Sequence, residues 1–112
     1  MESKTQHDLI VTIVNKCDAE KVVDASRKAG AEGGTILLGR GTGIHEQTRL
    51  FGIIIEPQKD VVLTLVKRSI SEQVLEAIVA RTELNKPGRG IAYVIPVERV
   101  AGITHLISKD EE

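Results

Sequence analysis

The chain has 112 residues, a formal net charge of -1 and 41% hydrophobic residues. These values predict one folded domain over residues 1–112 and exclude a disordered chain, because the apolar surface is sufficient for a single core. Phe51 and Tyr93 are the only aromatic residues, and charges of both signs are interspersed, so the composition argues against nucleic-acid binding through base stacking or a basic face.

The sequence favours a soluble protein of the cytoplasm. Cys17 is the only cysteine, which excludes an intrachain disulfide and fits a reducing compartment. A polar segment at residues 1–7 is expected to precede the fold and lacks the apolar stretch of a signal peptide. No apolar run approaches the ~20 residues that cross a bilayer.

The first half of the chain predicts a strand, a helix and a second strand. Residues 8–14 are β-branched and apolar, which is typical of a strand buried on both faces. A helix is expected from Asp18, as its cap, to Gly30, as its stop. Residues 35–41 then predict the second strand.

The second half predicts two strands, a helix and a last strand. Residues 50–57 and 60–66 are expected to be strands that run antiparallel across a short reversal at 56–59, because a proline lies between them. A helix is expected over 69–85 and a final strand over 91–97, whose proline at 96 indicates either a sheet edge or a strand end.

The second predicted helix has the clearest pattern. Ser69 and Glu72 match a capping box at its start. One apolar stripe follows at helical spacing, formed by Ile70, Val74, Leu75, Ile78 and Val79. The tail at 105–112 is expected to be frayed.

The order β-α-β-β-α-β predicts an α+β ferredoxin-like sandwich, with an antiparallel sheet and two helices on one face. Each helix has a single apolar stripe, so the other face of the sheet is left without a cover from this chain. The strands at 9–14 and 61–66 are apolar at nearly every position. Symmetric self-association is therefore expected to bury that face.

Two glycine-rich corners are candidate binding sites. The first, "GRGTG", is either a glycine bulge with a loop or a nest of backbone N–H groups for an anion. The second, "NKPGRG", is either a plain turn or a second phosphate contact. We expect the two corners to line one cleft between subunits. Their candidate residues are Arg40, Gly41, Thr42 and Gly43 in the first corner and Lys86, Gly88, Arg89 and Gly90 in the second.

No catalytic or metal site is predicted. His7, His45 and His105 lack the spacing of zinc ligands and are expected at the surface. Cys17 is expected to be a small packing residue, with an activated thiolate at a helix start as the alternative. No paired acid and base or nucleophile motif is present, so an enzyme is not expected.

The element order, the glycine segment and the stretch "ARTELNKPGRGIAYVIPVERV" resemble the P-II signal-transduction superfamily over residues 8 to 104. The most specific matches are Arg81 and Thr82 at the end of the second helix, the corner at 88–90, which resembles the family's B-loop, and 94–100 with Arg99.

This resemblance implies a homotrimer with its sheets packed inward and an adenine nucleotide, ATP, ADP or AMP, in each of three clefts between subunits. Thr35, Gly41 and Val66 match positions around the adenosine, and 88–90 matches the phosphate-facing corner. The family's T-loop, which follows the second strand, contacts membrane transporters or enzymes according to the ligand in the cleft.

The chain also departs from the family pattern. His45 stands where the family has a glutamine tied to 2-oxoglutarate and magnesium, Ile91 replaces a lysine, and Gly102 and Thr104 replace two arginines. The remaining cations Arg40, Lys86 and Arg89 suit ADP, AMP or a cyclic nucleotide. A T-loop of about 43–50 is expected, short and without the tyrosine modified in nitrogen-regulating members.

The resemblance thus implies a P-II-like regulatory trimer that binds an adenine nucleotide and regulates a transporter or enzyme. The alternative is a ferredoxin-like trimer of the metal-tolerance type, which would use His45 and carboxylates to hold a divalent cation.

Overall fold

A computed structural model of the chain describes residues 2–3, 6–41, 48–55 and 57–102. Several predictions of the sequence analysis lie outside these residues. They concern Thr42, Gly43, His45, Thr104 and the tail at 105–112 with His105.

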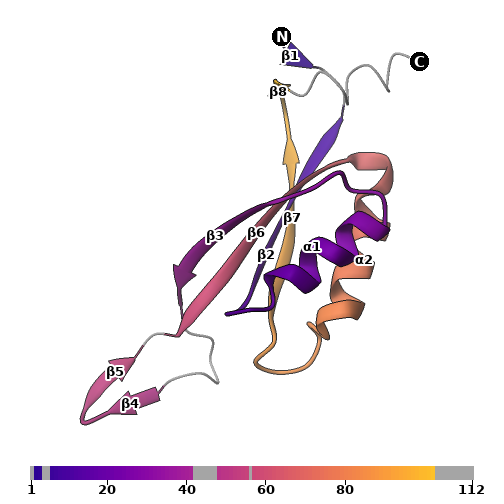
Figure 1. Cartoon of the computed structure of the whole chain (residues 1–112). Coiled ribbons are helices and arrows are strands. Elements are labelled where there is room, and N and C mark those ends of the chain that lie inside the picture. Colours follow the sequence, from indigo (N-terminus) through magenta and orange to yellow (C-terminus); the bar gives the residue numbers. More distant parts are fainter. Residues whose placement is uncertain (1, 4–5, 42–47, 56, 103–112) are drawn as a thin grey trace.

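Ten elements follow one another along the chain (Figure 1). They are β1 (Glu2–Ser3), β2 (His7–Asn15), α1 (Ala19–Lys28), β3 (Thr35–Arg40), β4 (Thr48–Leu50), β5 (Ile53–Ile55), β6 (Gln58–Lys67), α2 (Arg68–Thr82), β7 (Gly90–Val97) and β8 (Val100–Ala101).

The main sheet has four strands in the order β3-β6-β2-β7, and all neighbouring strands are antiparallel. Both helices pack on one face of this sheet and against each other (Figure 1). The α+β ferredoxin-like architecture predicted from the element order is confirmed. The edge position predicted for the proline-containing last strand is also confirmed, because β7 lies at one edge.

The core lies between the sheet and the helices. Alternate residues of β2 and β6 point to the helices, because side chains alternate across a strand. The fully or almost fully buried members of the core are Ile10, Val14, Val62, Val66, Val22, Val74 and Ile78. His7, predicted at the surface, is fully buried at the start of β2, because β6 and β7 flank that strand on both sides.

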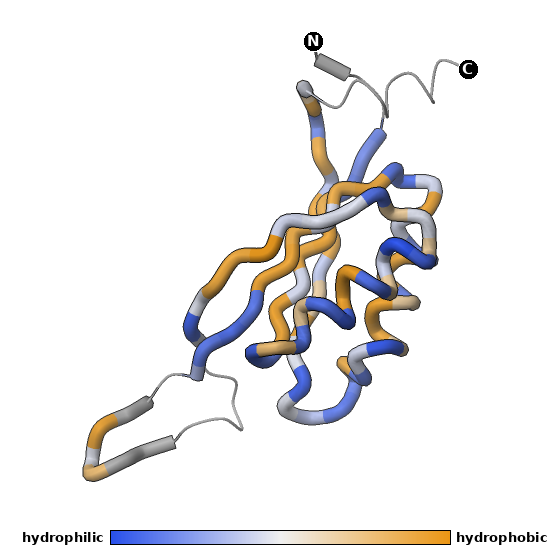
Figure 2. Tube along the Cα trace, in the orientation of Figure 1, coloured by the Kyte–Doolittle hydropathy of each residue, from blue (hydrophilic) through white to orange (hydrophobic). Residues whose placement is uncertain are grey.

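The opposite face of the sheet carries apolar side chains, and no element within the described residues covers it. Val11 pairs with Leu63 on one side and with Tyr93 on the other. Tyr93 is 43% exposed and Ile91 is 56% exposed. We call this surface the open face; it is formed by Leu9, Val11, Ile13, Leu37, Val61, Leu63, Leu65, Ile91, Tyr93 and Ile95. Figure 2 shows the apolar colour along these strands.

The start of α1 is stabilised by a residue from another element. Asp18 makes no capping hydrogen bond with its side chain. Instead, the carboxylate of Asp60 in β6 accepts the N–H groups of Cys17 (2.9 Å) and Ala19 (3.3 Å). Asp18 is the N-cap residue, as predicted, but its side chain does not cap the helix, because the Asp60 carboxylate of β6 takes that role. Cys17 is exposed and has a φ of 79°, so it is not a packing residue.

Helix α2 follows β6 without a loop. Its N-cap is Lys67, and no side chain caps it, so the capping box predicted at Ser69 and Glu72 is wrong. The helix begins before Ser69 because β6 continues to Lys67. The predicted apolar stripe is confirmed, since Val74 and Ile78 are fully buried.

The chain between β3 and β6 differs most from the prediction. Residues 50–57 do not form one strand: β4 and β5 pair as a separate hairpin, with Leu50 opposite Ile53. They do not pair with β6, because both edges of β6 are occupied by β2 and β3. The connection therefore runs from 41 to 57, longer than the predicted T-loop of 43–50.

Candidate functional site

Both predicted glycine corners lie at the same end of the sheet. There, β3 and β2 end while β6 and β7 begin. Gly39 lies opposite Lys59, Lys59 opposite Asn15, and Val14 opposite Gly90. The corners are separated by three strand spacings of about 4.8 Å, hence by about 14 Å within one chain.

A chain of hydrogen bonds crosses this end of the sheet. The Lys59 ammonium donates to the Asn15 Oδ1 at 2.8 Å, and the Asn15 Nδ2 donates to the Gly88 carbonyl at 2.9 Å. Lys59 is 7% exposed, so its charge requires such partners. The bridge joins the start of β6, next to the 41–57 connection, to the second glycine corner.

The second corner carries two cations and one anion. Glu83 has a left-handed φ of 55° just after α2. Its carboxylate lies 3.3 Å from the Lys86 Nζ and 3.3 Å from an Arg89 Nη. The pairs are partly exposed, so each contributes little to stability. A phosphate bound to Arg89 and Lys86 would compete with Glu83 for them.

The glycines of these corners differ in backbone φ and in the space around a Cβ. Gly90 has a φ of 142°, and a Cβ there would collide with the Ile13 carbonyl, so its role is structural. Gly88 has a φ of 79° with open space around a Cβ. A Cβ at Gly41 would also meet open space, and the φ of Gly41 is not left-handed. Neither a steric contact nor a left-handed φ requires a glycine at 41, and the missing Cβ leaves this backbone open to close approach by a ligand.

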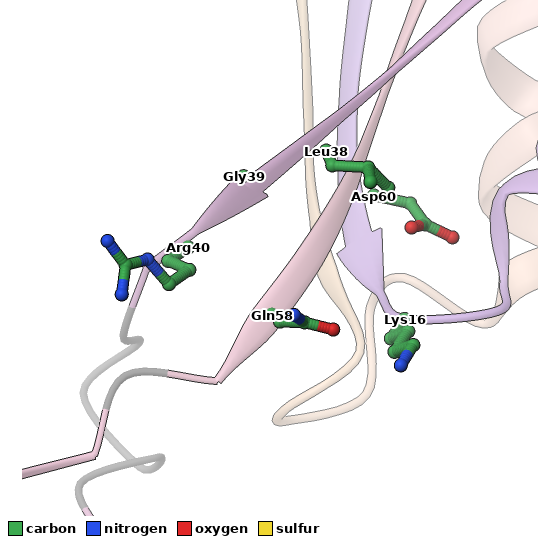
Figure 3. A pocket seen from close by; sticks show the side chains of 6 residues that line it. All are labelled: Lys16, Leu38, Gly39, Arg40, Gln58 and Asp60. Atoms are coloured by element: carbon green, nitrogen blue, oxygen red, sulfur yellow. The ribbon is translucent and has the colours of Figure 1, made fainter.

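A cavity of about 250 Å³ opens beside the first corner, where β3 ends and β6 begins. Its lining residues are Lys16, Leu38, Gly39, Arg40, Gln58 and Asp60. Figure 3 shows Gln58 between Arg40 and Lys16 in this view. Within the described part of the chain, neither Arg40 nor Lys16 has an ion-pair partner. The lining thus combines two cations and one amide with the carboxylate of Asp60, which already accepts the N–H groups of Cys17 and Ala19. The Arg40 guanidinium points away from Lys16 in Figure 3.

The other predicted adenosine residues lie elsewhere. Thr35 begins β3 opposite Leu63, about 17 Å along the extended strand from Arg40. Val66 is buried beside a second cavity of about 240 Å³ between the end of α1 and the start of α2. One protomer thus does not bring the predicted residues together, because an extended strand separates Thr35 from Gly41.

A buried carboxylate holds β2 to the start of α2 near Val66. Asp8 lies opposite Val66 and is 5% exposed; the Arg68 Nε donates to its Oδ1 at 2.9 Å. Burial disfavours the charged form and raises the pKa of Asp8, but hydrogen bonds from Ser71 and Arg68 and the guanidinium charge outweigh it. The net pKa lies below the ordinary 3.8.

The sequence matches the model of the family described as nitrogen regulatory protein P-II over residues 7–105. The chain belongs to the P-II family. Its fold is similar to the crystal structure of Arabidopsis thaliana PII bound to citrate, with a TM-score of 0.65 and 23% identity over 84% of this chain and 79% of the other. No curated protein matched the chain in sequence.

The P-II fold places residues in the site that sequence reasoning missed. Asn15, Lys59 and Glu83 are scattered along the chain, and no local pattern signals that the first two meet the second corner. The signal available was the spacing of Glu83, Lys86 and Arg89, which puts unlike charges within one short turn.

No helix of the described chain is long and apolar enough to span a membrane.

Proposed function

We propose that three copies of the chain assemble through their open faces and bind an adenine nucleotide in each cleft between neighbouring copies. Two observations support the assembly. The open face is continuous and apolar across β3, β6, β2 and β7, and surfaces of this kind mark protein interfaces. The P-II family, to which the chain belongs, consists of trimers.

The observation that carries the nucleotide site is the location of both glycine corners at one end of the sheet, where the hydrogen bonds of Lys59, Asn15 and Gly88 link them. The proposed trimer must bring the end of β3 in one copy close to Thr35 and Val66 of another copy, because one protomer keeps them apart. Arg40, Lys86 and Arg89 supply the charge for the phosphates. Because Glu83 offsets part of it, we expect ADP or AMP to bind at least as well as ATP.

The proposed role is regulatory and cytoplasmic, not enzymatic. The bound nucleotide contacts the start of the 41–57 connection and shifts its conformation. That shift changes its affinity for a transporter or enzyme. A ligand can bias such an equilibrium only by the difference in its affinity for the two states.

Isothermal calorimetry with ATP, ADP, AMP and citrate, and separately with zinc and copper ions, tests this function. Citrate is included because the similar Arabidopsis PII structure contains it. Heat with an adenine nucleotide, absent in Arg89→Ala, is the expected result. Heat with the metal ions alone would favour the metal-tolerance alternative, although the described residues hold no cluster of three metal-ligating side chains.

A further inference from the structure

The hairpin of β4 and β5 ends in a turn that its sequence does not favour. Leu50 pairs with Ile53, so Phe51 and Gly52 form a two-residue loop, with φ values of 51° and 81°. Two positive φ values define a type I′ turn, in which asparagine or aspartate before glycine is strongly preferred. A bulky residue with positive φ is uncommon because its Cβ meets the following carbonyl.

Phe51 also gains nothing from packing. It is 95% exposed, and Ile53 beside it is 67% exposed. The strands place this tip beyond the ends of β3 and β6, far from the helices (Figure 1), and Figure 2 shows its apolar colour. Neither turn geometry nor burial within this chain explains a phenylalanine at this point. Strained residues of this kind gather at sites that contact ligands or partners.

We propose that Phe51, with Ile53 at its side, is an anchor that enters an apolar pocket on the regulated protein. This inference rests on the proposed regulatory function and specifies how the partner is recognised. A single aromatic side chain seated in a dry pocket supplies much of the affinity of many interfaces. The pairing of β4 with β5 fixes the backbone beside residue 51, so little backbone freedom is lost on binding.

The surroundings favour a protein pocket over two other surfaces. A membrane-binding segment needs a broad apolar face flanked by basic residues. The exposed Phe51 and Ile53 lie at a two-residue turn, which is a narrow tip and suits a single pocket. A second copy of this chain is expected to pack on the open face, and the tip lies away from that face in Figure 1.

A photo-crosslinking experiment tests the anchor in lysates of cells that express the full chain. p-Benzoylphenylalanine replaces Phe51 in one variant and Glu76, an exposed residue of α2, in the control. The expected result is one dominant crosslinked protein at position 51. That protein should not crosslink at position 76. Purified unlabelled protein, added to the lysate before irradiation, then competes for that partner.

The competitors separate the side chain from the turn. Phe51→Asn creates the preferred Asn-Gly pair, so the hairpin is kept while the ring is lost. The concentration of Phe51→Asn that halves the crosslink should be at least about tenfold higher than that of the natural chain, whereas Phe51→Leu should compete almost as well as the natural chain. Equal competition by Phe51→Asn, crosslinks to lipid or to this chain alone, or no crosslinked protein would each overturn the proposal.

Calorimetry with ADP on Phe51→Asn distinguishes the two levels of the argument. Natural ADP binding with undiminished competition overturns the anchor but leaves the nucleotide site. If the natural chain does not bind ADP, the proposed function is overturned.

Discussion

The buried ammonium of Lys59 donates a 2.8 Å hydrogen bond to the carboxamide of Asn15, and the same carboxamide holds the Gly88 carbonyl at 2.9 Å. Two short contacts thus join the beginning of β6 to the second glycine corner. The side chain of Asn15 makes both contacts and so links the two segments.

Lys59→Met should loosen the second corner. The substitution leaves the Asn15 oxygen without its charged donor, and a hydrogen bond to a charged group contributes about 1.5–3 kcal/mol. We expect the free energy of unfolding to fall by about that amount and amide exchange at 86–90 to rise. Lys21→Met is the control, because the Lys21 pair with Asp18 is exposed and 3.6 Å long. Equal losses in the two variants, at one protein concentration, would show that the bridge has no special role.

Arg89 and Glu83 should affect nucleotide affinity in opposite directions. Arg89→Ala removes a phosphate donor and should weaken ADP binding by about 1.5–3 kcal/mol without unfolding the protein. Glu83→Gln frees Arg89 and Lys86 from a competing carboxylate and should strengthen ADP binding by about 0.2–1 kcal/mol, the range of an exposed ion pair. Calorimetry with ADP measures both. Weaker binding in Glu83→Gln would mean that these cations do not face the phosphates.

Gly41→Ala and Gly90→Ala separate a ligand role from a structural one. A methyl group at 41 meets open space, so thermal stability should stay within about 0.5 kcal/mol while ADP binding falls. At 90 the methyl group collides with the Ile13 carbonyl, so the thermal midpoint should drop sharply. Unchanged ADP affinity in Gly41→Ala would remove residue 41 from the site.

Acid stability should depend on Asp8. The folded state lowers the pKa of this carboxyl, so the protein holds it ionised to a lower pH than the unfolded chain does. The resulting stability is fully present above about pH 4, near the unfolded pKa, and is lost as pH falls through the lower folded value.

Asp8→Asn checks this dependence in urea titrations from pH 6 to pH 2.5. The free energy of unfolding of Asp8→Asn should fall furthest below that of the natural protein at pH 6, and the difference should shrink below about pH 4. Asp24→Asn, which breaks an exposed pair with Lys28, should show a small deficit. An Asp8→Asn deficit that stays constant with pH would contradict the assignment.

Regular periodicity made most of the fold predictable. The stripe containing Val74 and Ile78 fixed the buried side of α2, and the uninterrupted apolar runs of β2 and β6 indicated a sheet with two apolar faces. The prediction of one strand over 50–57 was wrong because the turn lies inside an apolar run, with phenylalanine at a position where asparagine is usual. The sequence pattern carried no mark of the reversal at Phe51 and Gly52.

The site was less predictable than the fold because its contacts are distant in sequence. Asp60 replaces Asp18 at the start of α1 from a different strand, and Lys59 meets Asn15 only through strand pairing. Gly90 was expected to face a phosphate, yet the nearby Ile13 backbone gives it a packing reason. Spacing along the chain contains none of this information.

Native mass spectrometry tests the central claim most directly, because it reports assembly and ligand count together. The account predicts a complex of three 12.2 kDa chains that takes up as many as three ADP molecules. Tyr93→Asp, which puts a charge on the open face, should appear as folded monomers without ADP, while Ala80→Asp at an exposed position of α2 should match the natural chain. A natural chain that stays monomeric, or a trimer that remains free of ADP, would contradict the account.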